Sequence, residues 1–283
     1  MRVRIVFLLN NKGAYLPFHH QYMLVEMLEK VLSESGERFR GFADYTFSGL
    51  KGQTKVSKFG LHYYSSRVTL VLSCPNQDFV DNFLSNLFKC DEVQLGNLLI
   101  TPESTEREYP VALEETLRCI SISPIVIMNP AVNSLNAKRF IPPDTDTFSD
   151  MLYESIMSRM ESSGLFTAEQ LASFYKFQLI PDKEYLQKIK DSDKKFARIY
   201  PTFGDEGQKY EVRGYTFPFA LHAAPEVRKF VFDCGLGALT HRGFGMLDLA
   251  QADLQRKTEP YLTHSIAQLV SVEQNGQSNS KYY

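Results

Sequence analysis

The chain has 283 residues, a length that allows one large domain or two of ordinary size. Hydrophobic residues make up 43% and charged residues 23%, a composition that excludes global disorder and gives ample material for a core. The formal net charge of −2 excludes a chain that binds nucleic acid through bulk positive charge, so any polyanion site must be a local patch.

Cysteine usage and the N-terminus indicate the cellular compartment. Cys74, Cys90, Cys119 and Cys234 are widely spaced and mostly lie in apolar runs, which predicts buried free thiols and neither metal ligands nor disulfides. The apolar run of residues 1–9 is too short for a signal peptide or a membrane-spanning helix. We therefore expect a cytoplasmic protein with no membrane partner.

The first half of the chain alternates strand and helix patterns. Period-two and β-branched runs predict strands, and apolar spacings of three and four predict helices over residues 18–32 and 78–88. The expected strands cover residues 2–9, 45–48, 59–64, 67–73 and 93–100, with 45–48 and 59–64 bracketing a hairpin. The resulting order, β-α-β-β-α-β, is the ferredoxin-like pattern.

The second half repeats that order. Residues 108–122 are expected to form a helical turn or an edge strand, and residues 121–128 the first strand of a new unit. Ser149 is a candidate N-cap for a helix over 149–162, and a capping-box pattern at Thr167 predicts another over 167–179. Strands over 196–203, 214–222 and 244–249, and a helix over 224–234, complete the unit.

These patterns predict an α+β protein of two tandem ferredoxin-like units, also described as RRM-like, with a cleft between them. The N-terminal domain would cover residues 1–120, and the C-terminal domain, residues 121–269, would carry a glycine-rich loop. The polar tail, residues 270–283, is expected to be loose. A cleft between two sheets is the natural place for a ligand.

The glycine-rich loop spans residues 235–245, with the sequence GLGALTHRGFG. Gly235, Gly237, Gly243 and Gly245 form two glycine-hydrophobe-glycine clamps, which require positive φ or a close approach to another group. Exposed N–H groups in such a loop can hold a phosphate, helped by the charge of a basic neighbour. The alternative is a turn that only reverses the chain.

This loop resembles the glycine signature of the CRISPR-associated repeat-RNA endoribonucleases, the Cas-six branch of the RAMP superfamily. Residues 212–219 before it and 245–249 after it fit the same context, and residues 16–22 (LPFHHQY) and 45–50 (YTFSGL) resemble N-terminal motifs of the family. The likeness runs from residue 1 to about residue 250.

The resemblance implies metal-independent cleavage of the repeats in a precursor CRISPR RNA, without a cofactor. A base removes the proton of a 2′-hydroxyl, the oxygen attacks the adjacent phosphorus, and an acid protonates the leaving 5′-oxygen. The products would be a 2′,3′-cyclic phosphate and a 5′-hydroxyl, and DNA would not be cut because it has no 2′-hydroxyl.

The family's usual histidine follows the first helix, but residues 32–41 contain no histidine. His19 and His20, at the start of the first helix, are the nearest substitutes, and His20 is preferred because its motif resembles the family most closely. Tyr22 is a candidate hydrogen-bond partner and Lys51 a candidate cation. Each histidine alone also fits a structural role at a helix N-terminus.

Further RNA contacts are expected from basic residues near aromatic ones. Arg40, Lys55 and Lys58, with Lys51 and Arg38, surround the aromatic residues 59, 63 and 64, and such a cluster can stack bases and hold phosphates. Each cation alone also fits solvated surface. The resemblance assigns His241 and Arg242, with the four loop glycines, to binding of the RNA backbone.

Three hypotheses follow: a processing endoribonuclease, a catalytically silent relative that binds repeat RNA within a CRISPR complex, and an unrelated ferredoxin-like domain that binds a nucleotide or a protein. The first two imply repeat RNA as partner, with other CRISPR-associated effector subunits as further partners, in a monomer or homodimer. The sequence has no Walker loop, HExxH motif or dinucleotide fingerprint, and no metal is expected.

Overall fold

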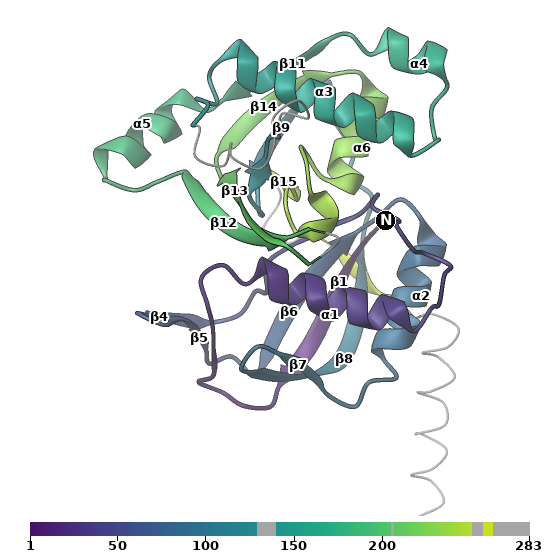
Figure 1. The fold of residues 1–283 in the computed structure, drawn as a ribbon, viewed down its shortest axis with the longest axis vertical. Coiled ribbons are helices and arrows are strands. Elements are labelled where there is room, and N and C mark those ends of the chain that lie inside the picture. The colour runs from purple at the N-terminus through teal and green to yellow at the C-terminus, as the bar shows by residue number, and fades with distance from the viewer. Residues whose placement is uncertain (129–139, 205–206, 251–256, 263–283) are drawn as a thin grey trace, which may run out of the picture.

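The computed structural model describes residues 1–128, 140–204, 207–250 and 257–262. Two sheet-and-helix units lie one above the other along the long axis of the molecule (Figure 1). The helices are α1 (Gln21–Ser33), α2 (Gln77–Leu87), α3 (Asp146–Ser162), α4 (Ala168–Ser173), α5 (Lys183–Asp191) and α6 (Pro225–Cys234), with a short 3-10 turn, η2 (Thr240–Arg242), in the glycine-rich loop.

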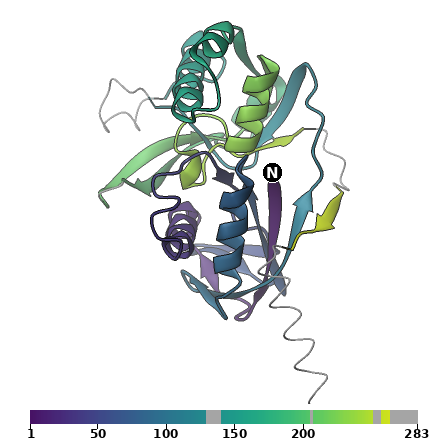
Figure 2. The same ribbon diagram turned by 90° about the vertical axis from the view of Figure 1, so that its right-hand side faces the viewer.

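The first unit is built on a twisted antiparallel sheet with the strand order β16-β8-β1-β6-β3. Its strands are β1 (Arg2–Leu9), β3 (Thr46–Phe47), β6 (Arg67–Ser73), β7 (Val93–Leu95), β8 (Leu98–Glu108) and β16 (Thr258–Pro260), where β7 pairs with β8. Val3, Ile5 and Phe7 alternate along β1 and are fully buried. They face α1 and α2, which cover one side of the sheet (Figure 2).

This topology confirms the ferredoxin-like prediction for the first half. β1 lies between β8 and β6, and β3 occupies the edge, as the order β1-α1-β3-β6-α2-β8 requires. The expected strand over residues 59–64 lies elsewhere: β5 (Gly60–Tyr63) pairs with β2 (Tyr15–Leu16) and β4 (Thr54–Ser57) in a separate small sheet. The β4–β5 hairpin projects from the body of the molecule (Figure 1).

The second unit repeats the topology with the strand order β11-β14-β9-β15. Its strands are β9 (Thr116–Ser121), β11 (Phe177–Pro181), β14 (Pro218–Ala223) and β15 (Leu247–Leu249). The helices α3 and α6 pack on this sheet through a second apolar core that includes Phe148, Leu152 and Val231. The fold class is therefore α+β with two tandem ferredoxin-like units, as predicted.

Two strand assignments and one helix assignment in the second half were wrong. The first strand is β9, not residues 121–128, of which only β10 (Ile125–Val126) is a strand. The second strand is β11, which was assigned to the end of a helix; α4 has no buried residue and ends at Ser173, whereas Leu179 and Pro181 are buried within the sheet. Burial of alternate residues therefore overrides the helical periodicity.

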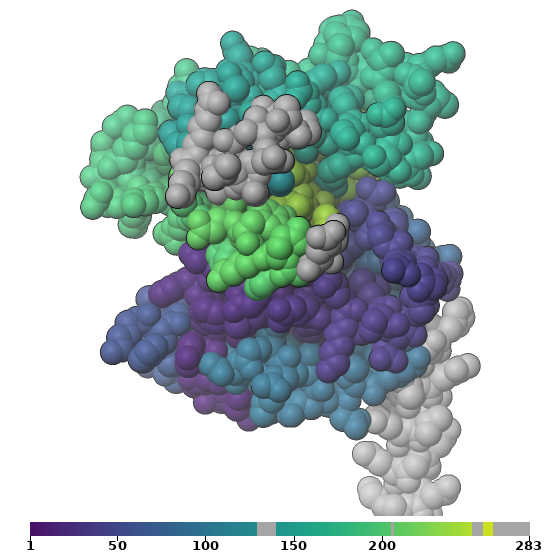
Figure 3. Space-filling view, in the orientation of Figure 1, coloured from purple at the N-terminus to yellow at the C-terminus, as the bar shows by residue number. Residues whose placement is uncertain are grey.

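The expected second strand, residues 196–203, belongs to an insertion. It forms β12 (Ala197–Phe203), which pairs with β13 (Lys209–Tyr215), and β10 joins them in a separate three-stranded sheet. β12 lies against α1 of the first unit, and in Figure 3 the bright green surface of this insertion rests directly on the purple surface of α1. The insertion thus extends the contact between the two units.

The strand pairing changes from one sheet to the other between β8 and β9, and β16 returns the chain to the first sheet. The division into domains at residue 120 stays a prediction, and the expected loose tail lies outside the described residues.

Cys74, Cys119 and Cys234 are buried free thiols, and Cys90 is a half-buried one. Within the described ranges, no helix has the length and apolar character needed to span a membrane.

Candidate functional site

The glycine-rich loop connects α6 to β15 and turns back on itself through glycines with positive φ. Gly237 has φ of 85°, and a Cβ there would lie 2.4 Å from the carbonyl oxygen of Val126. Gly245 has φ of 69°, and its Cβ would lie 2.1 Å from the carbonyl oxygen of Leu236. Both positions therefore require glycine, because any side chain would collide with backbone.

Arg159, from the last turn of α3, holds the loop from inside. Its Nη1 donates hydrogen bonds to the carbonyl oxygens of Gly235 (2.8 Å) and Gly237 (3.0 Å), and its Nη2 donates one to that of Cys234 (2.7 Å). The guanidinium also lies over the ring of Phe230, 5.2 Å from its centroid. A single half-buried guanidinium thus holds three carbonyl groups at the start of the loop.

The loop's glycines are buried, and several of its N–H groups are used within the protein. Leu236 N donates to Gly245 O, Ala238 N to Val126 O, and Gly245 N to Pro124 O. The expected row of exposed N–H groups around a phosphate is therefore not the geometry of this part of the loop. The assignment of the four glycines to RNA binding stays a prediction.

The loop packs on the first unit. Thr46 Oγ1, on β3, donates to the carbonyl oxygen of Phe244 at 3.0 Å, and a Cβ on Gly243 would lie 2.6 Å from the ring of Phe47. The ring of His241 makes an edge contact with Tyr45, with centroids 6.4 Å apart. The two sequence-distant motifs, residues 45–50 and 235–245, therefore meet at the junction of the units.

Arg242 faces a cavity of about 350 Å³ between α1 and the β12–β13 hairpin. Its side chain is 9% exposed, and Nη1 lies 3.4 Å from Oε1 of Glu29, whose side chain is 54% exposed. The other lining residues come from both units: Tyr22, Val25, Glu26, Thr202, Phe203, Gly204 and Gly207.

His20 lies at the N-cap of α1, but it is enclosed. It is 5% exposed, its Nδ1–H donates to the carbonyl oxygen of Pro17 at 3.0 Å, and its buried Nε2 has no hydrogen-bond partner. Nε2 faces Gly49, lying 3.8 Å from the position of a Cβ there. Burial lowers the pKa of His20, so this imidazole is held neutral inside the first unit. His20 is therefore not the exposed histidine that the sequence analysis expected.

His19 and Tyr22 lie nearer the boundary between the units. The half-buried ring of His19 makes an edge contact with Tyr200 of β12, with centroids 4.6 Å apart. Burial, reinforced by the charge of Arg198, lowers the pKa of His19. Tyr22 lines the cavity of Arg242 and contacts the ring of Phe203 at 5.7 Å.

Lys51 is exposed and bridges to Thr69 of β6. Desolvation lowers the pKa of Lys51, while the carboxylates of Asp248 and Glu108 raise it. Lys51 makes no described hydrogen bond or ion pair with His19, His20 or Tyr22. The assignment of these four residues to catalysis stays a prediction.

Lys55 and Lys58 lie on the projecting β4–β5 hairpin. The ammonium of Lys55 lies 5.0 Å from the ring centroid of Tyr64, and that of Lys58 lies 5.0 Å from that of Phe59. Arg40 follows the C-terminal end of α1 and pairs with Glu37 at 2.9 Å, whereas the hairpin pairs with β2, which precedes α1. The expected basic cluster therefore reduces to the hairpin.

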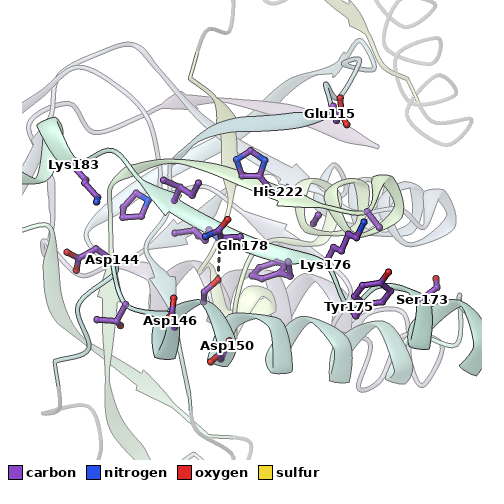
Figure 4. A pocket seen from close by; sticks show the side chains of 18 residues that line it. Glu115, Asp144, Asp146, Asp150, Ser173, Tyr175, Lys176, Gln178, Lys183 and His222 are labelled. Carbon is purple, nitrogen blue, oxygen red and sulfur yellow. Dashed lines mark hydrogen bonds between the residues drawn. The ribbon is translucent and has the colours of Figure 1, made fainter.

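A second cavity, of about 1040 Å³, lies between α3, β11 and β14, away from these residues (Figure 4). Asp144, Asp146 and Asp150 line it together with Lys176 and His222. None of the residues predicted to bind or cleave RNA lines this cavity. Across the described part of the chain, no group of three or more His, Cys, Asp or Glu side chains is arranged to hold a metal ion.

Two ferredoxin-like units in tandem, with a glycine-rich loop of the second packed on the first, define the class of this protein by its fold. The family model described as "CRISPR associated protein Cas6, C-terminal" matches residues 105–249, slightly more than half of the chain. The chain therefore belongs to the Cas6 family.

Individual proteins are similar to this chain in sequence or in fold. A protein of Methanocaldococcus jannaschii named CRISPR-associated endoribonuclease Cas6 1 is 21% identical over 241 residues, covering 82% of this chain and 86% of the relative. The structure of a Cas6-related protein from Pyrococcus furiosus has a TM-score of 0.72 at 18% identity, covering 89% of this chain and 99% of its own. A structure described as a RAMP protein binding different RNA substrates has the same TM-score at 19% identity, covering 89% and 100%.

Two residues of this region had no role in the sequence analysis. Glu29 lies two turns after Tyr22 on α1, so the spacing alone places them on one face of the helix. Arg159 gives no local indication of its role, because its partners in the loop lie far along the chain.

Proposed function

We propose that this Cas6 protein binds the repeats of precursor CRISPR RNA and cleaves them without a metal, by attack of a 2′-hydroxyl on the adjacent phosphorus. The products are a 2′,3′-cyclic phosphate and a 5′-hydroxyl. The observation that carries the proposal is the junction between the units, where the glycine-rich loop presents His241 and Arg242 beside α1. The name of the Methanocaldococcus relative, an endoribonuclease, supports the same activity.

In this proposal, RNA binds to two chemically different surfaces, the β4–β5 hairpin and the junction between the units. The exposed β4–β5 hairpin offers two cations over aromatic rings, a combination that holds phosphates and stacks unpaired bases. The junction itself offers a buried guanidinium, whose charge acts more strongly because water is partly excluded. The hairpin would supply affinity for RNA, and the junction would supply the groups that act on the scissile phosphate.

The test is incubation of the purified protein with its own repeat RNA in the presence of a chelator. A single cut that disappears when the nucleotide before the scissile phosphate is 2′-deoxy is the expected result. Cleavage that depends on added metal would contradict the mechanism, and failure to bind repeat RNA would contradict the function. Alanine variants of His19 and His20 test the predicted histidine pair in the same assay.

The second candidate is a catalytically silent Cas6 protein that holds repeat RNA for other CRISPR subunits. The enclosure of His20 and the absence of histidine from residues 32–41 favour it. Tight binding of the repeat with no cut in the same assay is the result that this candidate predicts. Effector subunits as partners, and a monomeric or homodimeric state, belong to either candidate.

A further inference from the structure

The cavity between α1 and the β12–β13 hairpin contains a carboxylate and a guanidinium from different units. Glu29, on α1, is open to solvent over about half of its side chain, with 54% exposed. Arg242, from the glycine-rich loop, is 9% exposed and forms the inner wall. Their nearest atoms are 3.4 Å apart, so both groups can reach one small ligand group.

We propose that this cavity is the site of RNA cleavage, with Glu29 as the general base and Arg242 as the cation that stabilises the phosphoryl oxygens. The proposal rests on the proposed endoribonuclease function and goes beyond it by placing the chemistry. Glutamate is an accepted general base for a hydroxyl proton, and arginine binds phosphate through paired N–H donors. His20, in contrast, is 5% exposed and turned toward Gly49.

The step balances without a metal or any further reagent. The Glu29 carboxylate takes the 2′-hydroxyl proton as the 2′-oxygen forms its bond to phosphorus. The bond from phosphorus to the 5′-oxygen then breaks, and this oxygen takes a proton from water. The hydroxide left behind removes the proton from Glu29, which restores the carboxylate.

The pairing of Glu29 with Arg242 favours the transition state over the bound substrate. In the free protein, part of the Arg242 charge is neutralised by Glu29. When Glu29 takes up the 2′-hydroxyl proton it loses its negative charge, at the moment when negative charge grows on the phosphoryl oxygens. The attraction of Arg242 for the phosphoryl group therefore rises during the reaction, which is the requirement for catalysis by differential binding.

The remaining walls include two aromatic rings, two glycines and a second carboxylate, that of Glu26. Tyr22 and Phe203 present rings whose centroids are 5.7 Å apart, one from each unit, and unpaired bases stack on such faces. Gly204 and Gly207 contribute wall without side chains. The volume of about 350 Å³ falls within the range of small-ligand sites, roughly 300–1,000 Å³.

The decisive variant is Glu29→Gln, which keeps the size of the side chain and removes its ability to accept the proton. We expect the single-turnover cleavage rate to fall at least about 100-fold, the usual contribution of a general base. Affinity for uncleaved 2′-deoxy repeat RNA should stay within about 3-fold, because the amide still occupies the cavity. Glu29→Asp should cut faster than Glu29→Gln, since it restores a carboxylate.

Glu34→Gln is the matched control, since Glu34 is exposed just after α1 and does not line the cavity. Arg242→Lys should lower the cleavage rate by about 100-fold, because one ammonium replaces the paired N–H donors. Thermal melting of each variant checks that it folds.

Three outcomes separate the proposals. Loss of cleavage in Glu29→Gln with retained RNA affinity supports this site. Cleavage within about 3-fold of the wild-type rate in Glu29→Gln overturns the role of Glu29 and leaves the endoribonuclease function standing. A wild-type protein that binds the repeat and never cuts it overturns both proposals.

Discussion

Arg159 is the residue whose replacement most directly tests the account of the glycine-rich loop. Arg159→Met keeps much of the side chain's length and its contact with Phe230 but removes three hydrogen bonds, to the carbonyl oxygens of Cys234, Gly235 and Gly237. Those oxygens lie in a buried stretch where water has little access. The three carbonyls would therefore lose their donors without gaining others.

The magnitude follows from typical costs of buried unsatisfied groups. Each buried acceptor left without a donor costs about 1–3 kcal/mol, and loss of one partner from a buried charged network costs about 3–5 kcal/mol in total. We expect the second, smaller total because burying the guanidinium in the wild type already has a desolvation cost. The same desolvation lowers the pKa of Arg159. We therefore expect a loss of about 3–5 kcal/mol in the free energy of unfolding and a decrease of roughly 10 °C in Tm.

The assay is urea unfolding followed by circular dichroism, together with thermal melting. Arg118→Met is the matched control, because Arg118 is exposed on β9, and its replacement should change the free energy of unfolding by less than about 0.5 kcal/mol. If Arg159→Met loses less than about 1 kcal/mol, the three hydrogen bonds do not hold the loop as described. Arg159→Lys should lie between the wild type and Arg159→Met, since a single ammonium cannot reach all three carbonyls.

Three further predictions concern the loop, the enclosed histidine and the hairpin. Gly243→Ala should cost about 2–4 kcal/mol in urea unfolding, because φ is 80° and the new Cβ would lie 2.6 Å from the Phe47 ring; a neutral effect would contradict the packing of the loop on β3. Burial lowers the pKa of His20 in the folded state, so the unfolded chain binds more protons and stability falls as the pH drops below about 6.5. His20→Gln should reduce this loss of stability at low pH, measured as the difference in urea midpoint between about pH 7.5 and about pH 5.5. An unchanged difference would contradict the assignment of the pH dependence to His20. Lys55→Gln with Lys58→Gln should weaken RNA binding and reduce the slope of log affinity against log salt by about 1.4, whereas the α5 pair Lys188→Gln with Lys190→Gln should leave the slope unchanged.

The overall fold was predictable because its strands and helices carry strong local patterns. Alternate burial along β1 and the apolar face of α2 are both visible in the sequence, and together they define the ferredoxin-like order of the first half. The second half was harder, because the β12–β13 insertion has strand patterns as clear as those of the sheet itself. Only the pairing of β11 with β14 shows which strand belongs to the core.

The candidate site was less predictable because its residues are brought together by tertiary contacts. His20 lies within a motif that resembles the family, yet nothing local shows that its ring turns inward to Pro17. Arg40 and Lys55 looked like one basic cluster from their separation along the chain, but Arg40 pairs with Glu37, whereas Lys55 lies on the projecting β4–β5 hairpin. Glu29 is visible only as one polar position on α1, because β12 and Arg242, which face it, come from the other unit.

The glycines of the loop have a structural role that their pattern alone does not show, whereas their assignment to RNA binding stays a prediction. A glycine-rich loop can bind an anion when its N–H groups stay free, but Gly237 and Gly245 lie where backbone meets backbone. Their contribution is to let the loop pass close to residues 124–126, so that η2 and Arg242 lie against α1. The charge of the loop therefore comes from Arg242, and the glycines determine where that charge is held.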